Sequence, residues 1–80
     1  MSEGTRSFHH TAYNVACIHA LRGETGAAVE WLRKTAETGM PNYPLFARDA
    51  FLDRIRRQPA FVAFMEDLQP RWKRLSLEFQ

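Results

Sequence analysis

The chain contains little that would cross-link it or anchor it in a membrane. It has one cysteine in 80 residues, Cys17, so no disulfide can form within a single copy. Sparse use of cysteine fits a reducing compartment. No basic segment followed by an apolar run opens the sequence, so no signal peptide is expected. The longest strongly apolar run, residues 61–65, is far too short to span a bilayer, and we expect a cytoplasmic protein.

Net charge is also small, because 11 basic and 9 acidic residues leave only +2. Its distribution is uneven, since residues 1–40 carry four basic and four acidic side chains and residues 41–80 carry seven and five. The ten aromatic residues argue against disorder. A chain of this length makes one domain at most, and its small core makes that domain marginally stable.

Apolar spacing predicts two helices in the first half of the chain. We expect them over residues 8–22 and 26–38, with a short turn between them. Ser7 and Thr25 are the expected N-caps, because a hydroxyl there can accept an unpaired backbone N–H. Gly39 suits the end of the second helix. No segment alternates with a period of two, so no strand is predicted.

Prolines divide the second half. Residues 39–44 contain two of them and predict a loop. A third helix is expected to begin after Asp49 as N-cap, and a fourth at Pro59, which suits the first helical position. Pro70 falls inside the fourth helix and predicts a kink or short break. The apolar stripe of this helix comprises Phe61, Phe64, Met65, Leu68, Trp72, Leu75 and Phe79.

Residues 12–35 combine small and large side chains at the spacing of a close-packed helical hairpin. Small residues let two antiparallel helices approach, and large ones fill the space beside them. This segment resembles the tetratricopeptide repeat, a helix-turn-helix module of about 34 residues. The residues at that family's packing positions are Val15, Ala16, His19, Gly23, Ala28, Leu32 and Thr35.

The second half resembles the terminal segment that closes some bacterial tetratricopeptide arrays. The resemblance implies an all-α fold with a hairpin over 7–39 and capping helices over 45–80, in one domain that follows a flexible leader at 1–6. It also implies a non-catalytic protein-interaction module that closes a helical-repeat scaffold and binds a protein or peptide. The matching residues are Gly39, Phe46, Arg48, Asp49, Leu52, Asp53, Ile55, Arg56, Pro59, Ala60 and Phe61.

One face of the first predicted helix maps onto the surface that lines the concave groove in this family. An asparagine amide can donate to and accept from a ligand backbone, and a tyrosine offers apolar area with a polar tip. The alternative is that the third helix or a neighbouring chain covers this face. The groove residues implied by the resemblance are His10, Tyr13, Asn14, Cys17 and Leu21.

No constellation of residues supports catalysis or metal binding. His9, His10, Cys17 and His19 lie along one helix, and His19 points away from the others, so they cannot converge as the four ligands of a closed zinc site. A cysteine nucleophile needs a base and an oxyanion site, which usually come from different elements. We therefore expect no catalytic residue, no metal and no cofactor, and interpret Cys17 as a packing residue.

Basic residues leave an alternative function open. Cationic side chains interleaved with an aromatic residue are one footprint of nucleic-acid binding. Trp72 belongs to the apolar stripe, however, and the acidic residues Asp53, Glu66 and Asp67 interrupt the positive field. Binding of nucleic acid or another polyanion is therefore the second hypothesis. Its candidate residues are Arg54, Arg57, Arg71, Lys73 and Arg74.

The first predicted helix carries apolar residues on two faces, and one hairpin cannot cover both. The isolated chain is therefore expected to form a symmetric dimer. The competing arrangement is a monomer whose later helices fold back over this face. The contact surface of the dimer would use part of Tyr13, Cys17, Ile18 and Leu21, with the tail around Trp72 as an optional addition.

Overall fold

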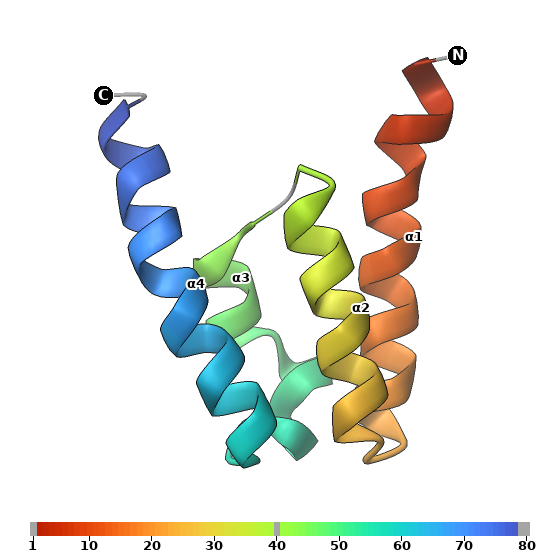
Figure 1. Cartoon of the computed structure of the whole chain (residues 1–80). Coiled ribbons are helices and arrows are strands. Elements are labelled where there is room, and N and C mark those ends of the chain that lie inside the picture. The colour runs from red at the N-terminus through yellow and green to blue at the C-terminus, as the bar shows by residue number, and fades with distance from the viewer. Residues whose placement is uncertain (1, 40, 79–80) are drawn as a thin grey trace.

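The computed structural model describes the backbone of residues 2–39 and 41–78 and the side chains of residues 11–39 and 41–77. This part of the chain consists of helices joined by short turns and loops and contains no strand, so the predicted all-α fold is confirmed (Figure 1). Its helices are α1 (Ser2–Leu21), α2 (Thr25–Glu37), α3 (Tyr43–Arg48), the 3-10 helix η1 (Ala50–Ile55) and α4 (Pro59–Glu78).

The predicted hairpin is present, because α1 and α2 pack side by side in antiparallel directions (Figure 1). The chain reverses at Gly23, whose φ of 75° lies in the left-handed region that favours glycine. Small residues lie in the interior of the hairpin, where they let the two backbones approach closely. Ala12, Ala16 and Ala20 of α1 and Ala28 of α2 are all buried.

Both predicted N-caps of the hairpin are wrong. α1 begins at Ser2, so Ser7 lies inside the helix, and α2 begins at Thr25, so Glu24 holds the cap position. The Glu24 side chain makes no cap hydrogen bond. It turns instead toward α1, where its Oε1 lies 2.7 Å from Nδ1 of His19 and its Oε2 lies 3.4 Å from Nε of Arg22. The contact with His19 lowers the pKa of Glu24.

The predicted loop contains the start of a helix that sequence analysis missed. α3 begins at Tyr43, and Oδ1 of Asn42 caps it by accepting the backbone N–H of Leu45 at 3.2 Å. Pro44 fits because it lies in the first turn, where backbone N–H groups have no helical partner. The next helix begins after Asp49 as predicted, and Asp49 Oδ1 accepts the backbone N–H of Phe51 at 2.9 Å.

The last helix, α4, starts at Pro59 as expected but passes through Pro70 without the predicted break. Proline removes one hydrogen bond, to the carbonyl of Glu66. Both Glu66 and Pro70 are exposed, so water can satisfy that carbonyl. Phe61, Phe64 and Leu68 of the predicted apolar stripe are buried. Phe79 lies outside the described residues.

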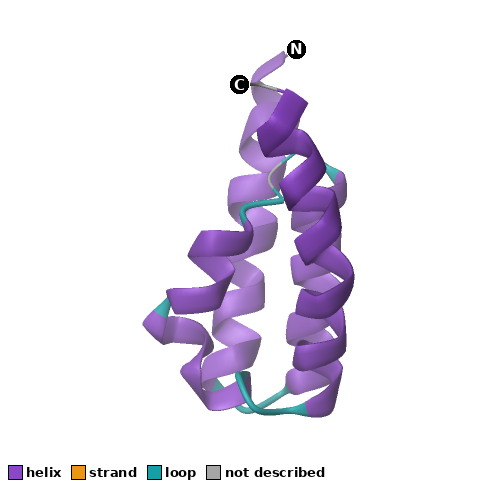
Figure 2. Ribbon diagram, turned by 90° about the vertical axis from the view of Figure 1, so that its left-hand side faces the viewer, coloured by secondary structure: helices purple, strands orange, loops and turns teal. Residues whose placement is uncertain are grey.

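The short helices α3 and η1 lie on one side of the three long helices (Figure 2). Phe46 of α3 is fully buried there and connects the elements across the core. Its ring stacks on Tyr13 of α1 at a centroid distance of 5.5 Å, and it lies 6.2 Å from the ring of Phe64 on α4. The domain is therefore closed by contacts between residues far apart in sequence.

Candidate functional site

An open groove of about 600 Å³ separates the end of α2 from the second half of α4. Its lining is mostly apolar, and it combines one edge of α2, the connector that follows it and about a turn and a half of α4. The lining residues are Ala36, Glu37, Gly39, Pro41, Arg71, Trp72, Leu75 and Ser76.

The groove exists because α4 is longer than the surface that it packs against. The first half of α4 contacts α2 and α3, and Arg33 of α2 lies over the ring of Phe64 at 5.8 Å. The apolar stripe continues beyond Leu68, but α4 then runs past the end of α2 (Figure 1). Trp72 and Leu75 are consequently only half-buried. An apolar stripe without a complete partner is the main property of this site.

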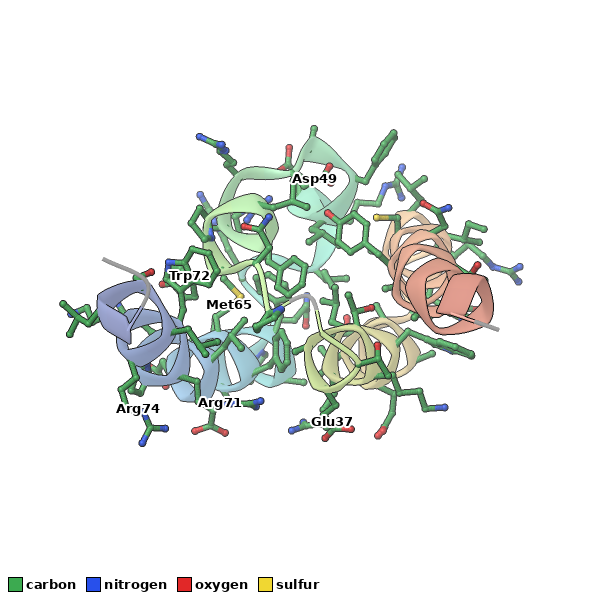
Figure 3. All side chains as sticks on the ribbon, turned by 90° about the horizontal axis from the view of Figure 1, so that it is seen from above. Glu37, Asp49, Met65, Arg71, Trp72 and Arg74 are labelled. Atoms are coloured by element: carbon green, nitrogen blue, oxygen red, sulfur yellow. The ribbon has the colours of Figure 1, made fainter. Side chains whose placement is uncertain are left out.

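The groove has a positive border on its α4 side. Arg71 and Arg74 are exposed and lie on one side of α4, whereas Trp72 lies on the other (Figure 3). Neither arginine makes an ion pair with a carboxylate of the described side chains. The lining contains one basic and one acidic side chain, Arg71 on α4 and Glu37 on α2, and the exposed Arg74 lies beside the lining on α4. The positive charge is therefore on the α4 side of the groove, and the negative charge is on its α2 side.

The groove residues expected on α1 lie elsewhere and do not form one open surface. Tyr13 packs on Phe46, and Cys17 is only 7% exposed. The alternative weighed from the sequence, in which the third helix covers this face, applies to these two residues, because η1 packs against α1. Asn14 and Leu21 remain exposed, and the side chain of His10 lies outside the described ones.

The surface expected to form a dimer is divided in the same way. Tyr13 and Cys17 contribute to the interior, whereas Ile18 and Leu21 of α1 remain exposed. The dimer itself stays a prediction.

A polar contact joins α1 to the start of η1. The Tyr13 hydroxyl donates a hydrogen bond to Oδ2 of Asp49, while Oδ1 of the same carboxylate caps η1. Burial and this hydrogen bond both raise the pKa of Tyr13. Burial also raises the pKa of the Cys17 thiol, which keeps it protonated and unreactive near neutral pH. The cluster therefore positions η1 and has no feature of a catalytic pair.

Replacing Tyr13 with phenylalanine should test this contact. We expect a loss of about 1 kcal/mol near neutral pH, because the Asp49 carboxylate loses a donor. The raised pKa means that the folded protein keeps the tyrosine proton above about pH 10, where the unfolded chain loses it. Its contribution to stability is thus complete below that pH and declines above it. Urea unfolding between about pH 8 and 11 should show that the free energy of unfolding falls less steeply with rising pH in the variant than in the wild type. Equal declines would contradict this role of Tyr13.

The candidate anion-binding residues form two separate groups. Arg54 and Arg57 lie near the start of α4, whereas the group from Arg71 to Arg74 lies about 12 residues along it, roughly 18 Å away at 1.5 Å per residue. All five basic residues are exposed. One extended anion could contact both groups only by following the whole of α4.

Arg56 lies between Arg54 and Arg57 in the sequence, but its guanidinium makes hydrogen bonds within the domain. Its Nη1 donates to the carbonyl of Phe46 at 3.1 Å and also to that of Ala47. Its Nη2 donates to the carbonyl of Asp49 at 2.6 Å and to Oδ1 of Asp53 at 3.0 Å. The carbonyls of Phe46 and Ala47 lie in the last turn of α3, where no helical donor remains for them, whereas that of Asp49 also accepts the backbone N–H of Leu52 at 3.0 Å. Arg56 is therefore the C-terminal cap of α3, which nothing in the local sequence pattern indicated.

No three His, Cys, Asp or Glu side chains within the described ranges lie close enough together to hold a metal ion. Within the same ranges, no helix combines the length and hydropathy that a bilayer crossing requires.

Comparison with protein-family models, curated proteins and solved structures finds no significant match to this chain. The site is therefore interpreted from its own geometry, as an apolar groove with a basic border on a small all-α domain.

Proposed function

We propose that this chain is a non-catalytic protein-interaction module and that the groove between α2 and α4 binds a segment of a partner protein. The observation that carries the proposal is the half-buried pair Trp72 and Leu75 in a concave, mostly apolar lining. Large apolar side chains in a concave site are the usual anchors of protein recognition, and tryptophan is prominent among them.

The resemblance of residues 12–35 to a tetratricopeptide repeat supports the same class of function. The second half resembles the segment that closes some tetratricopeptide arrays. We therefore propose that the chain is the last unit of a helical-repeat scaffold. The proposed binding surface differs from the one that the resemblance implies on α1, because Cys17 is buried and Tyr13 is partly buried against Phe46. Polyanion binding is the second candidate function, favoured by the exposed basic residues beside the groove, which form no ion pair with a described carboxylate.

Selection of a displayed peptide library on the folded domain would test the proposal. Selected peptides should shift the NMR signals of the Trp72 indole, Ala36 and Leu75. A Leu75→Glu variant should weaken binding by about tenfold or more, because the apolar anchor is lost and a charged group would have to be desolvated when a partner covers the lining.

The matched control is Leu77→Glu. This leucine is also on α4 but is 72% exposed and does not line the groove. Its substitution should leave affinity unchanged, and circular dichroism should show that both variants remain helical. Selection of no peptides, or of peptides that bind the Leu75→Glu variant as well as the wild type, would contradict the proposal.

A further inference from the structure

We infer that the segment bound in this groove is an amphipathic helix of the partner with acidic residues along one side. This inference rests on the proposed function and specifies its ligand. The apolar face of the incoming helix would lie on Trp72 and Leu75, with its carboxylates beside Arg71 and Arg74.

The shape of the groove favours a helix as the occupant. Its walls are two helices and a connector, and the described part of the chain offers no strand edge to which an extended peptide could add. Apolar grooves between helices bind the apolar face of another helix, through anchors three and four residues apart. Residues 71–76 of α4 line about 8 Å of the groove at 1.5 Å per residue. This length matches about a turn and a half of a bound helix.

The charges around the groove determine which side of that helix is acidic. Successive residues of an α-helix are about 100° apart, which places Arg71 and Arg74 on one flank of α4, beside Leu75. Both are exposed, and no described carboxylate pairs with them. Glu37 lines the opposite border, on α2. A helix with carboxylates toward α4 and none toward Glu37 is therefore the best electrostatic match.

Two other anionic partners fit the groove less well. A membrane surface needs an apolar face that projects outward, whereas Trp72 and Leu75 line a concavity. A nucleic acid needs phosphate contacts along its path, and the second basic group, Arg54 and Arg57, lies at the other end of α4. Both become outcomes of the test.

Two designed peptides of about 18 residues would test the inference, since shorter helices are marginal in water. Both carry the same leucine stripe, and one flank is glutamate in the first peptide and lysine in the second. The acidic peptide should bind about tenfold or more tightly than the basic one in about 50 mM salt. The difference should shrink in about 500 mM salt, because exposed charges are then screened.

Charge reversal on the protein provides the decisive comparison. The double variant Arg71→Glu, Arg74→Glu should invert the preference between the peptides. The matched control, Arg54→Glu with Arg57→Glu, should preserve it, because these exposed arginines are away from the groove. If the wild type binds both peptides equally and the Leu75→Glu variant binds neither, the inference of an acidic helix is overturned, but the proposed function stands. Binding of neither peptide at the groove would overturn both.

Competition would identify any other occupant. A single-stranded oligonucleotide of about 15 nucleotides, or vesicles containing anionic lipid, should not displace the acidic peptide. Displacement by either at lower concentration than the peptide itself would overturn the inference in favour of that ligand. Sedimentation equilibrium should show that the peptide-free protein does not use the groove to dimerise. A dimer dispersed by Leu75→Glu but retained in Leu77→Glu would overturn the inference in favour of a second copy of this chain.

Discussion

Replacing Phe46 with alanine is expected to unfold most of the domain. Phe46 is fully buried and contacts the rings of Tyr13 and Phe64, so its removal leaves a cavity where α1, α3 and α4 meet. Phenylalanine-to-alanine changes in a core cost about 3–5 kcal/mol. Small domains have a total stability of only about 5 kcal/mol at the lower limit. Urea titration followed by circular dichroism should therefore show a large loss of folded protein even without denaturant.

Phe51→Ala is the matched control for this prediction. Phe51 is on η1, five residues further along the chain, and is 55% exposed. We expect its substitution to change the free energy of unfolding by less than about 1 kcal/mol. A larger effect at Phe51 than at Phe46 would mean that α3 and η1 present different faces to the core.

The second large effect is expected at Arg56. Its guanidinium donates to the carbonyls of Phe46, Ala47 and Asp49, so alanine would leave the end of α3 without a cap. Hydrogen bonds from charged donors contribute about 1.5–3 kcal/mol each and are not additive. We expect Arg56→Ala to lower the free energy of unfolding by about 2–3 kcal/mol, measured by urea titration.

Two further variants separate charge from geometry at this position. Arg56→Lys keeps the charge but lacks the planar fork, so we expect it to recover less than half of the loss. Arg57→Ala removes the neighbouring arginine, which is exposed and makes no ion pair with a described carboxylate, and should be nearly neutral. Full recovery by lysine would show that α3 needs a positive charge and no particular hydrogen-bond arrangement.

The sequence by itself determined the helical class of this domain and the starts of η1 and α4 in the second half. Spacings of three and four residues identified the stripe of α4, and Pro59 marked where that helix starts. Gly23 marked the turn of the hairpin, and Asp49 marked the start of η1. These features depend on residues within one turn of each other, so the local sequence contains the necessary information.

Predictions from the local sequence were wrong where a side chain contacts a residue outside its own helix. Glu24 contacts His19, five residues earlier on the preceding helix, and does not cap its own helix. The start of α3 was predicted as loop, because two prolines suggested irregular structure and only the cap formed by Asn42 shows that a helix fits there.

Only the tertiary structure decided which surfaces remain open. The contact between Tyr13 and Asp49 spans 36 residues, and it places η1 against Tyr13 and Cys17, which are part of the face of α1 that resembled a binding groove. Periodicity shows that a helix has an apolar face but not which element covers it, because coverage depends on the lengths and directions of other helices. Here α4 extends beyond the end of α2, and Trp72 and Leu75 are left lining a groove.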